Sequence, residues 1–401
     1  MKEIKSIYIH FPYCKSFCNY CDFFKIPLPK VISNLNNSNL NNNDKSLFSE
    51  FHQYLDNSFM KVETTPIKTI ETLYIGGGSP SLWGKEGICY IKNFLLKNKI
   101  QFTNEYEFTL EFSPATNNWE STLNYWREIG VNRISVGVQT LNSDIFYKLE
   151  RKHTIKDAFN LLDYLQKNNW NYSVDFMLGL PGSEKKIKAR EENGNGDRDI
   201  VQELKTVMEF KPNHFSIYIF SPQKTYPNHL RKIIPTEDFI CEEYLKTADY
   251  LKKNAFVHYE VSNFAKFGFE SRHNQRYWNN CESYLALGPS SSGFIIDTDN
   301  TGNRYTFSDD FSGNIEIDSL GEKELLLEKI YLTLRTNRGL NALTTMPIAN
   351  KEEFACLAKI FISWKEKGLV ESEFPLIKLS SKGLLLLDSI MDDLFKCLQL
   401  L

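Results

Sequence analysis

Residues 8–22 read YIHFPYCKSFCNYCD, a strand-like start followed by three closely spaced cysteines. Cys14, Cys18 and Cys21 have the spacing C-x3-C-x2-C. Three thiolates on one tight loop can each hold one iron of a [4Fe-4S] cluster, which leaves the fourth iron without a protein ligand. The alternative is a zinc site in an interaction protein, with His10 as a fourth ligand. Structural zinc commonly takes four ligands as two separated pairs, so the spacing favours the cluster.

The other five cysteines do not cluster in the sequence. Eight cysteines in 401 residues are too few for a disulfide scaffold. Single cysteines are most often small apolar residues in the core, and we predict that role, unpaired, for all five. They are Cys89, Cys241, Cys281, Cys356 and Cys397.

The rest of the first 300 residues predicts strands that alternate with helices. In 156–168, Ala158, Leu161, Leu162 and Leu165 recur with the period of one helix face. Strands separated by helices indicate repeated βα units around a parallel sheet, either open or closed into a barrel. The six predicted strands are 7–11, 72–75, 107–112, 133–138, 173–178 and 215–220.

Polar or glycine residues follow these strands with regularity. The cysteine loop follows the first strand, and a run of three glycines and Ser79 follows the second. Glu111, Gln139 and Asp175 lie at or near the ends of later strands. Barrel enzymes build their active sites at the carboxyl ends of parallel strands, so we expect these side chains to meet.

Two segments interrupt this plan, and a third region differs in character. Residues 34–44 contain seven asparagines, and 183–199 contain ten charges in seventeen residues. Both are predicted to be exposed loops without a function, because they offer little apolar surface to bury. We divide the chain into a barrel at 1–300 and a small helical, winged-helix-like domain at 301–401, whose expected role is packing against the barrel.

Charge and hydropathy exclude several classes. Forty-seven basic and fifty acidic residues give a net charge of −3, which disfavours nucleic-acid binding. No apolar run approaches the roughly 18 residues that a membrane span needs. The amino-terminal residues lack the apolar core of a signal peptide, so we expect a cytoplasmic protein.

These motifs resemble the radical S-adenosylmethionine (SAM) superfamily, in which this cysteine spacing follows the first strand of a partial (β/α)6 barrel. Within it, the chain is similar to the branch that contains the oxygen-independent coproporphyrinogen III oxidases and related heme chaperones. The resemblance covers most of residues 4–294. It rests on the segments 76–81, 137–139, 151–153, 179–182, 259–265 and 273–278.

The resemblance implies roles for individual residues. The cysteines would bind the cluster, and SAM would chelate its open iron. The glycine turn at Gly78 and Ser79 would let the backbone approach the methionine part of SAM. The remaining implied residues are Glu111 as a counter-charge to a cationic ligand, Arg151 for the SAM carboxylate, Gln139 and Asp175 for the ribose hydroxyls, and Tyr8 and Tyr20 as flanking groups that order SAM and shield the cluster.

The same resemblance leaves two functions open, and whether the chain is an enzyme stays open with them. A carrier would bind heme and pass it to an acceptor hemoprotein, such as a membrane-bound respiratory one. An oxidase would decarboxylate coproporphyrinogen III by radical SAM chemistry. The oxidases have a fourth cysteine two positions after the third, where this chain has Phe23, and a longer amino-terminal extension. Both differences favour the carrier, so no catalytic residue is predicted.

Heme needs an axial ligand, and His273 in the motif 273–278 is the candidate, with Arg276 near a propionate and Tyr277 and Trp278 on the ring. The alternative for His273 is a hydrogen-bonded histidine in a loop that closes the barrel.

Overall fold

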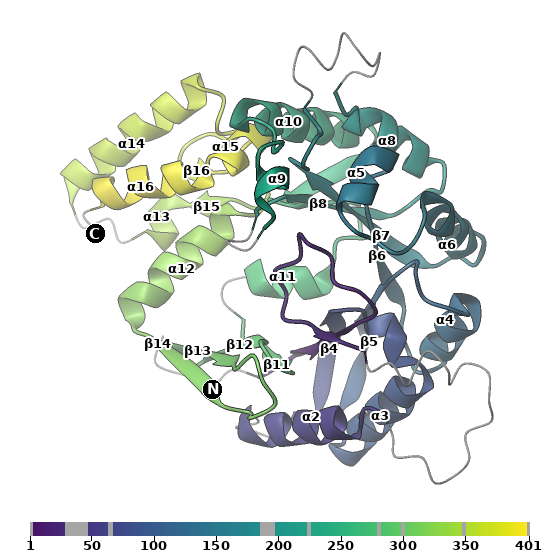
Figure 1. The fold of residues 1–401 in the computed structure, drawn as a ribbon. Helices are drawn as coiled ribbons and strands as arrows, with labels where there is room; N and C mark the ends of the chain where they lie inside the picture. Colours follow the sequence, from purple (N-terminus) through teal and green to yellow (C-terminus); the bar gives the residue numbers. More distant parts are fainter. Residues whose placement is uncertain are drawn as a thin grey trace, which may run out of the picture.

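A nine-stranded sheet organises the protein, which is described here by a computed structural model (Figure 1). The strand order is β11-β1-β4-β5-β6-β7-β8-β10-β9. The structure describes residues 3–28, 47–62, 67–184, 197–222, 226–278, 282–297, 301–346 and 350–398. The six central strands are β1 (Ser6–Phe11), β4 (Thr69–Gly77), β5 (Gln101–Phe112), β6 (Arg133–Gln139), β7 (Asn171–Leu178) and β8 (His214–Ile219).

These six strands lie in chain order and all run parallel, which confirms the predicted partial (β/α)6 barrel. Antiparallel β10 extends the sheet beyond β8, and a short parallel strand, β11, extends it beyond β1. The extending strands are β9 (Phe256–Glu260), β10 (Asn263–Lys266) and β11 (Leu285–Leu287), and a separate two-stranded pair after β1 consists of β2 (Tyr13–Cys14) and β3 (Ile26–Pro27).

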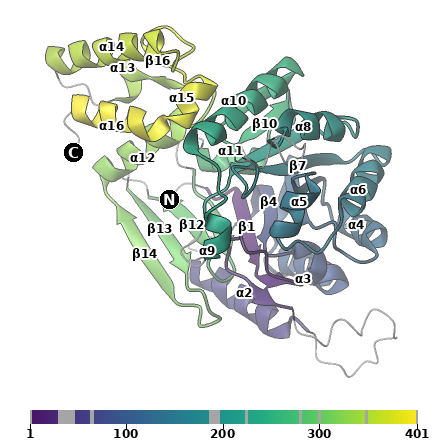
Figure 2. The same ribbon diagram turned by 45° about the horizontal axis from the view of Figure 1, so that its top comes forward.

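Helices cover the outer face of the sheet (Figures 1 and 2). In α6, the four residues predicted from the helical period are all buried, and a capping box at Thr154 and Asp157 begins the helix. The helices along the barrel are α2 (Ser49–Val62), α3 (Gly84–Lys97), α4 (Trp119–Glu128), α5 (Ser143–Lys148), α6 (Ile155–Lys167), α8 (Ile200–Met208), α9 (Asn228–Arg231) and α10 (Glu237–Lys253), with a 3-10 turn η1 (Pro80–Trp83).

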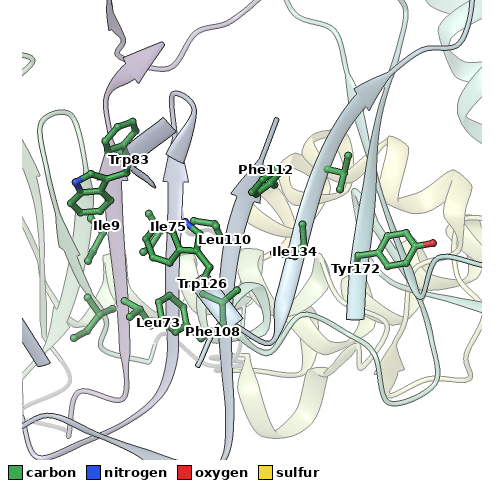
Figure 3. Close-up of a cluster of buried hydrophobic side chains, with 14 of the residues drawn as sticks. Ile9, Leu73, Ile75, Trp83, Phe108, Leu110, Phe112, Trp126, Ile134 and Tyr172 are labelled. Atoms are coloured by element: carbon green, nitrogen blue, oxygen red, sulfur yellow. The ribbon is translucent and has the colours of Figure 1, made fainter. Parts of the chain in front are cut away.

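The two faces of the strands differ in chemistry because successive side chains point to opposite sides. Leu73, Ile75 and Leu110 belong to the apolar core (Figure 3). Alternate residues on the same strands are polar and hydrogen-bond with one another inside the barrel. The buried polar residues on the six central strands are Ser6, His10, Thr72, Glu107, Thr109, Arg133, Ser135, Ser173, His214 and Ser216.

A short helix, α11 (Arg272–Trp278), lies against the polar face of the barrel. The main-chain N–H of His273 donates to the Glu107 carboxylate on β5 over 3.1 Å, and the His273 ring hydrogen-bonds Thr72 on β4. The polar interior therefore positions α11.

The carboxyl-terminal region has a sheet and a helical unit (Figure 2). A three-stranded sheet of β12 (Ser292–Ile296), β13 (Gly302–Phe307) and β14 (Ile315–Leu320) adds Ile295, Tyr305 and Phe307 to the barrel core. The boundary predicted at residue 300 lies inside this sheet. A second core begins at Ile330. It involves α12 (Glu322–Leu334), α13 (Ala342–Thr345), α14 (Lys351–Glu366), α15 (Ser381–Leu385), α16 (Leu387–Cys397) and the strand pair β15 (Leu340–Asn341) and β16 (Leu376–Ile377).

Two cysteines differ from the prediction. Cys356 on α14 and Cys397 on α16 form a disulfide across 41 residues of sequence. The prediction of unpaired thiols was wrong for this pair, because helix packing brings together residues that are distant in the chain. Cys89 is exposed, Cys241 is half-buried and both are free, whereas Cys281 lies outside the described residues.

The two predicted loops have different outcomes. Residues 34–44 lie outside the described residues. Of 183–199, the described ends are not fully exposed: Ser183 and Arg198 are buried, and Arg198 pairs with Glu203 and Glu243. The prediction was wrong at Arg198, because its guanidinium pairs with two buried carboxylates. No helix within the described ranges is long and apolar enough to span a bilayer.

Candidate functional site

The cysteine loop is fixed at both ends. After the loop, the N–H of Ile26 donates to the Pro12 carbonyl over 2.9 Å, and the N–H of Leu28 donates to the Cys14 carbonyl over 2.8 Å. The loop therefore leaves β1 and returns to the same place, which holds its cysteines over the carboxyl ends of the barrel strands.

One cavity of about 430 Å³, the main cavity, gathers most of the predicted site. Cys14, Cys18 and Cys21 line one part of it. The carboxyl ends of β4, β5, β6 and β7 form the rest, as expected for a barrel site. The predicted residues on its wall are Tyr20, Gly78, Ser79, Glu111, Gln139, Arg151 and Asp175.

The three cysteines line one part of the cavity, and their side chains do not meet at a single point. Within the described ranges, no three side chains of His, Cys, Asp or Glu gather closely enough to hold a single metal ion. A cubane takes each thiolate on a different iron, so its ligands stand further apart than the ligands of one ion. Three cysteines that form no disulfide and lie on the wall of one cavity fit that requirement.

Burial makes two of the loop thiols, Cys14 and Cys21, hold their protons strongly. Burial raises the pKa of Cys14 to about 11, against the opposing effect of a hydrogen bond from Ser79, and burial also raises the pKa of Cys21. Because only thiolates bind iron, loading the site displaces protons from this loop.

Glu111 supplies the cavity with a carboxyl group whose charge is adjustable. Its oxygens accept hydrogen bonds from the Tyr74 hydroxyl over 3.0 Å and from the Gly77 N–H over 3.1 Å. Burial, and then the charge of Asp175, raise the pKa of Glu111 to about 7. A cationic ligand would favour the ionised form.

Arg151 is a cation on the wall of the same cavity. Its guanidinium donates to the Tyr20 hydroxyl and, over 2.7 Å, to the Gly137 carbonyl. Its Nε is buried without a hydrogen-bond partner among the described residues. Tyr20 therefore orients Arg151, while the unpaired Nε leaves donor capacity for an anionic ligand group.

Gln139 and Asp175 differ in how far their polar groups are satisfied. Gln139 has a positive φ of 71°, and its buried Oε1 has no partner among the described residues. Asp175 accepts from the hydroxyls of Ser135 and Ser173 at 3.0 to 3.1 Å. The unpaired Gln139 oxygen fits an acceptor for ligand hydroxyls, and Asp175 is already held by serines.

The glycine turn works differently from the prediction. The N–H groups of Gly78 and Ser79 donate to the carbonyls of Phe11 and Tyr13 at 2.7 and 2.9 Å, so they are not free for a ligand. A Cβ on Gly78 would lie 2.7 Å from the Tyr13 carbonyl oxygen. Glycine is needed here because β1 and its continuation approach the turn closely.

Tyr8 does not line the main cavity, which corrects its predicted place beside SAM. Its hydroxyl hydrogen-bonds Nδ1 of His10 at 3.1 Å, and both residues border a second cavity of about 460 Å³. Its sequence proximity to the cysteines misled the prediction, because Tyr8 shares its cavity with Asp22, Phe23 and Phe24 and not with the cysteines. The second cavity is lined by Tyr8, His10, Asp22, Phe23, Phe24, Tyr277, Trp278, Glu282, Tyr284, Ser290, Ser291, Ser292, Phe294, Glu328 and Leu332.

His273 is a hydrogen-bonded histidine, the second of its two predicted alternatives. Its ring is 1% exposed, Nδ1 lies 2.8 Å from the Thr72 hydroxyl and Nε2 lies 2.7 Å from the Tyr277 hydroxyl. Burial, then Arg133 and Arg276, lower its pKa to about 3. With both nitrogens occupied and neither cavity within its reach, His273 does not fit an axial ligand in this structure.

Sequence reasoning missed many residues of the main cavity, and Ser135, Met177 and Tyr218 are examples from three neighbouring strands. Ser135 on β6 holds Asp175, while Met177 on β7 and Tyr218 on β8 supply wall surface. All three lie inside predicted strands, at 133–138, 173–178 and 215–220. The alternation of side chains along a strand is the signal for Ser135, four residues before Gln139, and for Met177, two residues after Asp175. The strand of Tyr218 carries no predicted site residue.

Comparisons with known proteins agree with this architecture. Residues 8–188 match the family model of the radical SAM superfamily. Coproporphyrinogen III oxidase (HemN) from Escherichia coli has the same fold: the TM-score is 0.70 at 19% identity, over 98% of this chain and 90% of that one.

Sequence relatives match over most of the chain. The heme chaperone HemW of Buchnera aphidicola subsp. Schizaphis graminum is 30% identical over 72% of this chain and 70% of its own length. HemW of Bacillus subtilis is 28% identical over 96% and 97%. Radical S-adenosyl methionine domain-containing protein 1, mitochondrial, of Mus musculus is 28% identical over 98% and 88%. The chain belongs to the HemW family of the radical SAM superfamily.

Proposed function

We propose that this protein is a heme chaperone. It holds a [4Fe-4S] cluster on Cys14, Cys18 and Cys21, binds SAM beside the cluster, and transfers heme to an acceptor hemoprotein, for which a respiratory one is our candidate. It acts in the reducing cytoplasm, where thiols stay available for iron. The observation that carries the proposal is the main cavity, whose wall is shared by the three loop cysteines and by unsatisfied polar groups of Gln139 and Arg151.

Different side chains of the main cavity bind different parts of SAM. Arg151, oriented by Tyr20, pairs with the carboxylate, and Glu111 offsets the positive charge. Gln139 accepts from the ribose through its unpaired Oε1, with Asp175 beside it. The bound cluster supplies one open iron position at which the SAM amino and carboxylate groups are chelated.

Phe23 favours the carrier over an oxidase. It stands where coproporphyrinogen oxidases have a fourth cysteine, and its side chain is 61% exposed between the two cavities. A phenyl ring at this place adds apolar surface and no sulfur. The names of the sequence relatives support the carrier as well, whereas the likeness to HemN concerns the fold alone.

One paired assay separates the two functions. Anaerobically reconstituted protein is titrated with hemin and, separately, incubated with SAM, a reductant and coproporphyrinogen III. The chaperone should take up hemin at micromolar or lower concentration and convert no coproporphyrinogen. Conversion at enzymatic rates would select the oxidase, and failure to bind hemin would reject the chaperone.

The cluster assignment is tested by cysteine variants. Cys14→Ala, Cys18→Ala and Cys21→Ala should each lose most iron and sulfide and weaken SAM binding. Cys89→Ala is the matched control, because Cys89 is a free, exposed cysteine on α3. Full iron and sulfide content in a loop variant would show that the ligands lie elsewhere, and zinc without sulfide in the wild-type protein would reject the cluster.

A further inference from the structure

The carboxyl-terminal helical unit contains a pair of cysteines that belongs to neither cavity. Cys356 on α14 and Cys397 on α16 are joined, and their Cα atoms are 5.8 Å apart, an ordinary separation for a disulfide. Within the described ranges they are the only cysteines that pair. Helix packing positions the pair, because α14 and α16 lie side by side (Figures 1 and 2).

The cysteine loop and this pair favour opposite redox conditions. The loop cysteines bind iron only as thiolates, so the protein loads its cluster where thiols stay reduced. In such a compartment, glutathione and thioredoxin keep thiols reduced, and the cysteine pairs that do close are usually transient and respond to redox change. The Cys356–Cys397 pair is thus placed to exchange between two thiols and a disulfide.

The surroundings of the pair allow a small disulfide to react with it. Cys397 is buried, with 7% of its surface exposed, whereas Cys356 is half-buried and follows exposed Ala355 on α14. Thiol–disulfide exchange needs access to one sulfur only, because attack there forms a mixed disulfide that the second thiol resolves. Cys356 provides that access, and Cys397 is the resolving thiol.

The bond ties down the end of α16. Cys397 is the final residue of this helix, and Leu394 and Leu398 beside it belong to the second core. Terminal turns open easily unless a contact holds them. A second contact, from the Trp364 Nε1–H to the Asp393 carboxylate over 3.1 Å, holds α16 one turn earlier and involves no sulfur. Reduction therefore releases the last turn of α16 and leaves the rest of the helix packed.

We propose that Cys356 and Cys397 form a reversible thiol–disulfide switch, which takes a small disulfide such as glutathione disulfide as its oxidant. Closing the switch locks the last turn of α16 against α14. The inference goes beyond heme and SAM binding, and of the proposed function it uses only the reducing compartment.

The oxidation proceeds in two exchange steps. The Cys356 thiolate attacks one sulfur of glutathione disulfide, which forms a mixed disulfide and releases one glutathione thiolate. The Cys397 thiolate then attacks the Cys356 sulfur, which forms the protein disulfide and releases the second glutathione thiolate. Two protein thiols are oxidised, one small disulfide is reduced, and the two protons of the protein thiols pass to the two departing thiolates.

The switch is tested first on the wild-type reconstituted protein, equilibrated anaerobically in glutathione buffers. Thiols are trapped with N-ethylmaleimide, and the peptides that carry Cys356 and Cys397 are read by mass spectrometry, which separates them from the loop cysteines. The pair should be mostly dithiol in a large excess of reduced glutathione and mostly disulfide at equal concentrations of the reduced and oxidised forms. A pair that stays fully oxidised or fully reduced in both buffers would overturn the switch.

The locking of α16 is tested by hydrogen exchange at residues 394–398 in the same two buffers. These amides should exchange at least tenfold faster in the reduced protein, because the terminal turn is then free to open. The oxidised protein should also melt several degrees higher, since a bond across 41 residues restricts the unfolded chain. Equal exchange in the two forms would overturn the locking.

A variant assigns the response to this pair. Cys356→Ser removes the accessible sulfur and should make exchange and melting identical in the two buffers. Cys241→Ser is the matched control, because Cys241 is also a half-buried helix cysteine without a disulfide, and it should keep both differences. A redox response that survives in Cys356→Ser would overturn the assignment. Hemin binding and cluster iron are measured separately, so failure of the switch leaves the proposed function standing.

Discussion

The carboxyl group of Glu111 controls the charge of the main cavity. Its pKa of about 7 means that the free protein holds both the protonated and the ionised form of this group near neutral pH. Its folded pKa lies above its unfolded value of 4.5, so it stabilises the fold at low pH and that contribution is lost as pH rises through 7.

We predict a pH-dependent SAM affinity that originates at Glu111. A cationic ligand binds the ionised form, so the affinity of the reconstituted protein should rise by up to about tenfold per pH unit below pH 7 and level off above it. Calorimetric titration from pH 5.5 to 8.5 measures this. Glu111→Gln should bind more weakly at pH 8 and lose the dependence; an unchanged profile in the variant would place the titrating group elsewhere.

His273 has a structural role at the same scale. Its ring stacks on Tyr74 with centroids 5.0 Å apart and hydrogen-bonds Tyr277, which borders the second cavity. The His273 ring therefore links the polar interior of the barrel to the wall of the second cavity, although His273 itself lines neither cavity.

We predict that His273→Ala lowers stability and leaves heme ligation intact. Losing two buried hydrogen bonds and a packed ring should cost about 2–4 kcal/mol, visible as a lower Tm. Below that Tm, the absorbance maxima of bound hemin should match those of the wild type. Ser319→Trp, a substitution at an exposed serine on β14, is the control for hemin binding. A shifted hemin spectrum in the folded variant would restore His273 as the axial ligand.

Among the elements, the turn after β4 determines where the cysteine loop lies. Gly78 lets the turn approach the backbone of residues 11–13, and the resulting hydrogen bonds join β4 to the start of the loop. The cluster ligands thus depend on a residue that binds no metal.

We predict that Gly78→Ala impairs cluster loading. Its Cβ would lie 2.7 to 3.0 Å from three backbone atoms, which have no room to move. Iron content after reconstitution should fall severalfold and the Tm should drop. Gly321→Ala is the control, because its Cβ meets only the flexible carboxylate end of Glu324. Normal iron content in Gly78→Ala would show that the turn and the loop are independent.

At the scale of the whole molecule, a buried ion cluster connects distant segments. Arg198 donates to Glu203 on α8 at 2.8 Å, lies 3.6 Å from Glu243 on α10, and donates to the Met177 carbonyl on β7. The N–H of Gly179 also donates to Glu243. Arg198, near the end of the charged segment 183–199, thereby joins α8 and α10 to the end of β7.

We predict that Arg198→Ala destabilises the protein by about 3–5 kcal/mol, because it leaves two carboxylates buried without a cation. Thermal unfolding measures the loss. The deficit should be largest at high pH, where Glu243 is ionised, and smaller at low pH, because burial raises the pKa of Glu243. Lys205→Ala on α8, outside the cluster, is the control; an equal loss in both variants would exclude the buried carboxylates as the cause.

Local sequence patterns were sufficient for the parallel strands, the cysteine loop and most of the main cavity. The reason is that a parallel barrel places the carboxyl ends of all its strands at one end, so chain order alone brings Glu111, Gln139 and Asp175 near the cysteines. The helical period of α6 was equally readable, because its buried face depends only on residues three and four apart.

Tertiary packing determined the side-chain positions that the local patterns did not predict. Tyr8 and His273 were assigned to ligands from their neighbours in sequence, whereas the strand twist and the position of α11 turn Tyr8 toward a second cavity and bury His273. Glu243, one partner of Arg198, and Cys397, the partner of Cys356, are likewise distant in the chain. Spacing along a chain predicts which residues share one loop or one sheet edge. The cavity that a residue lines, in contrast, depends on the elements packed against it.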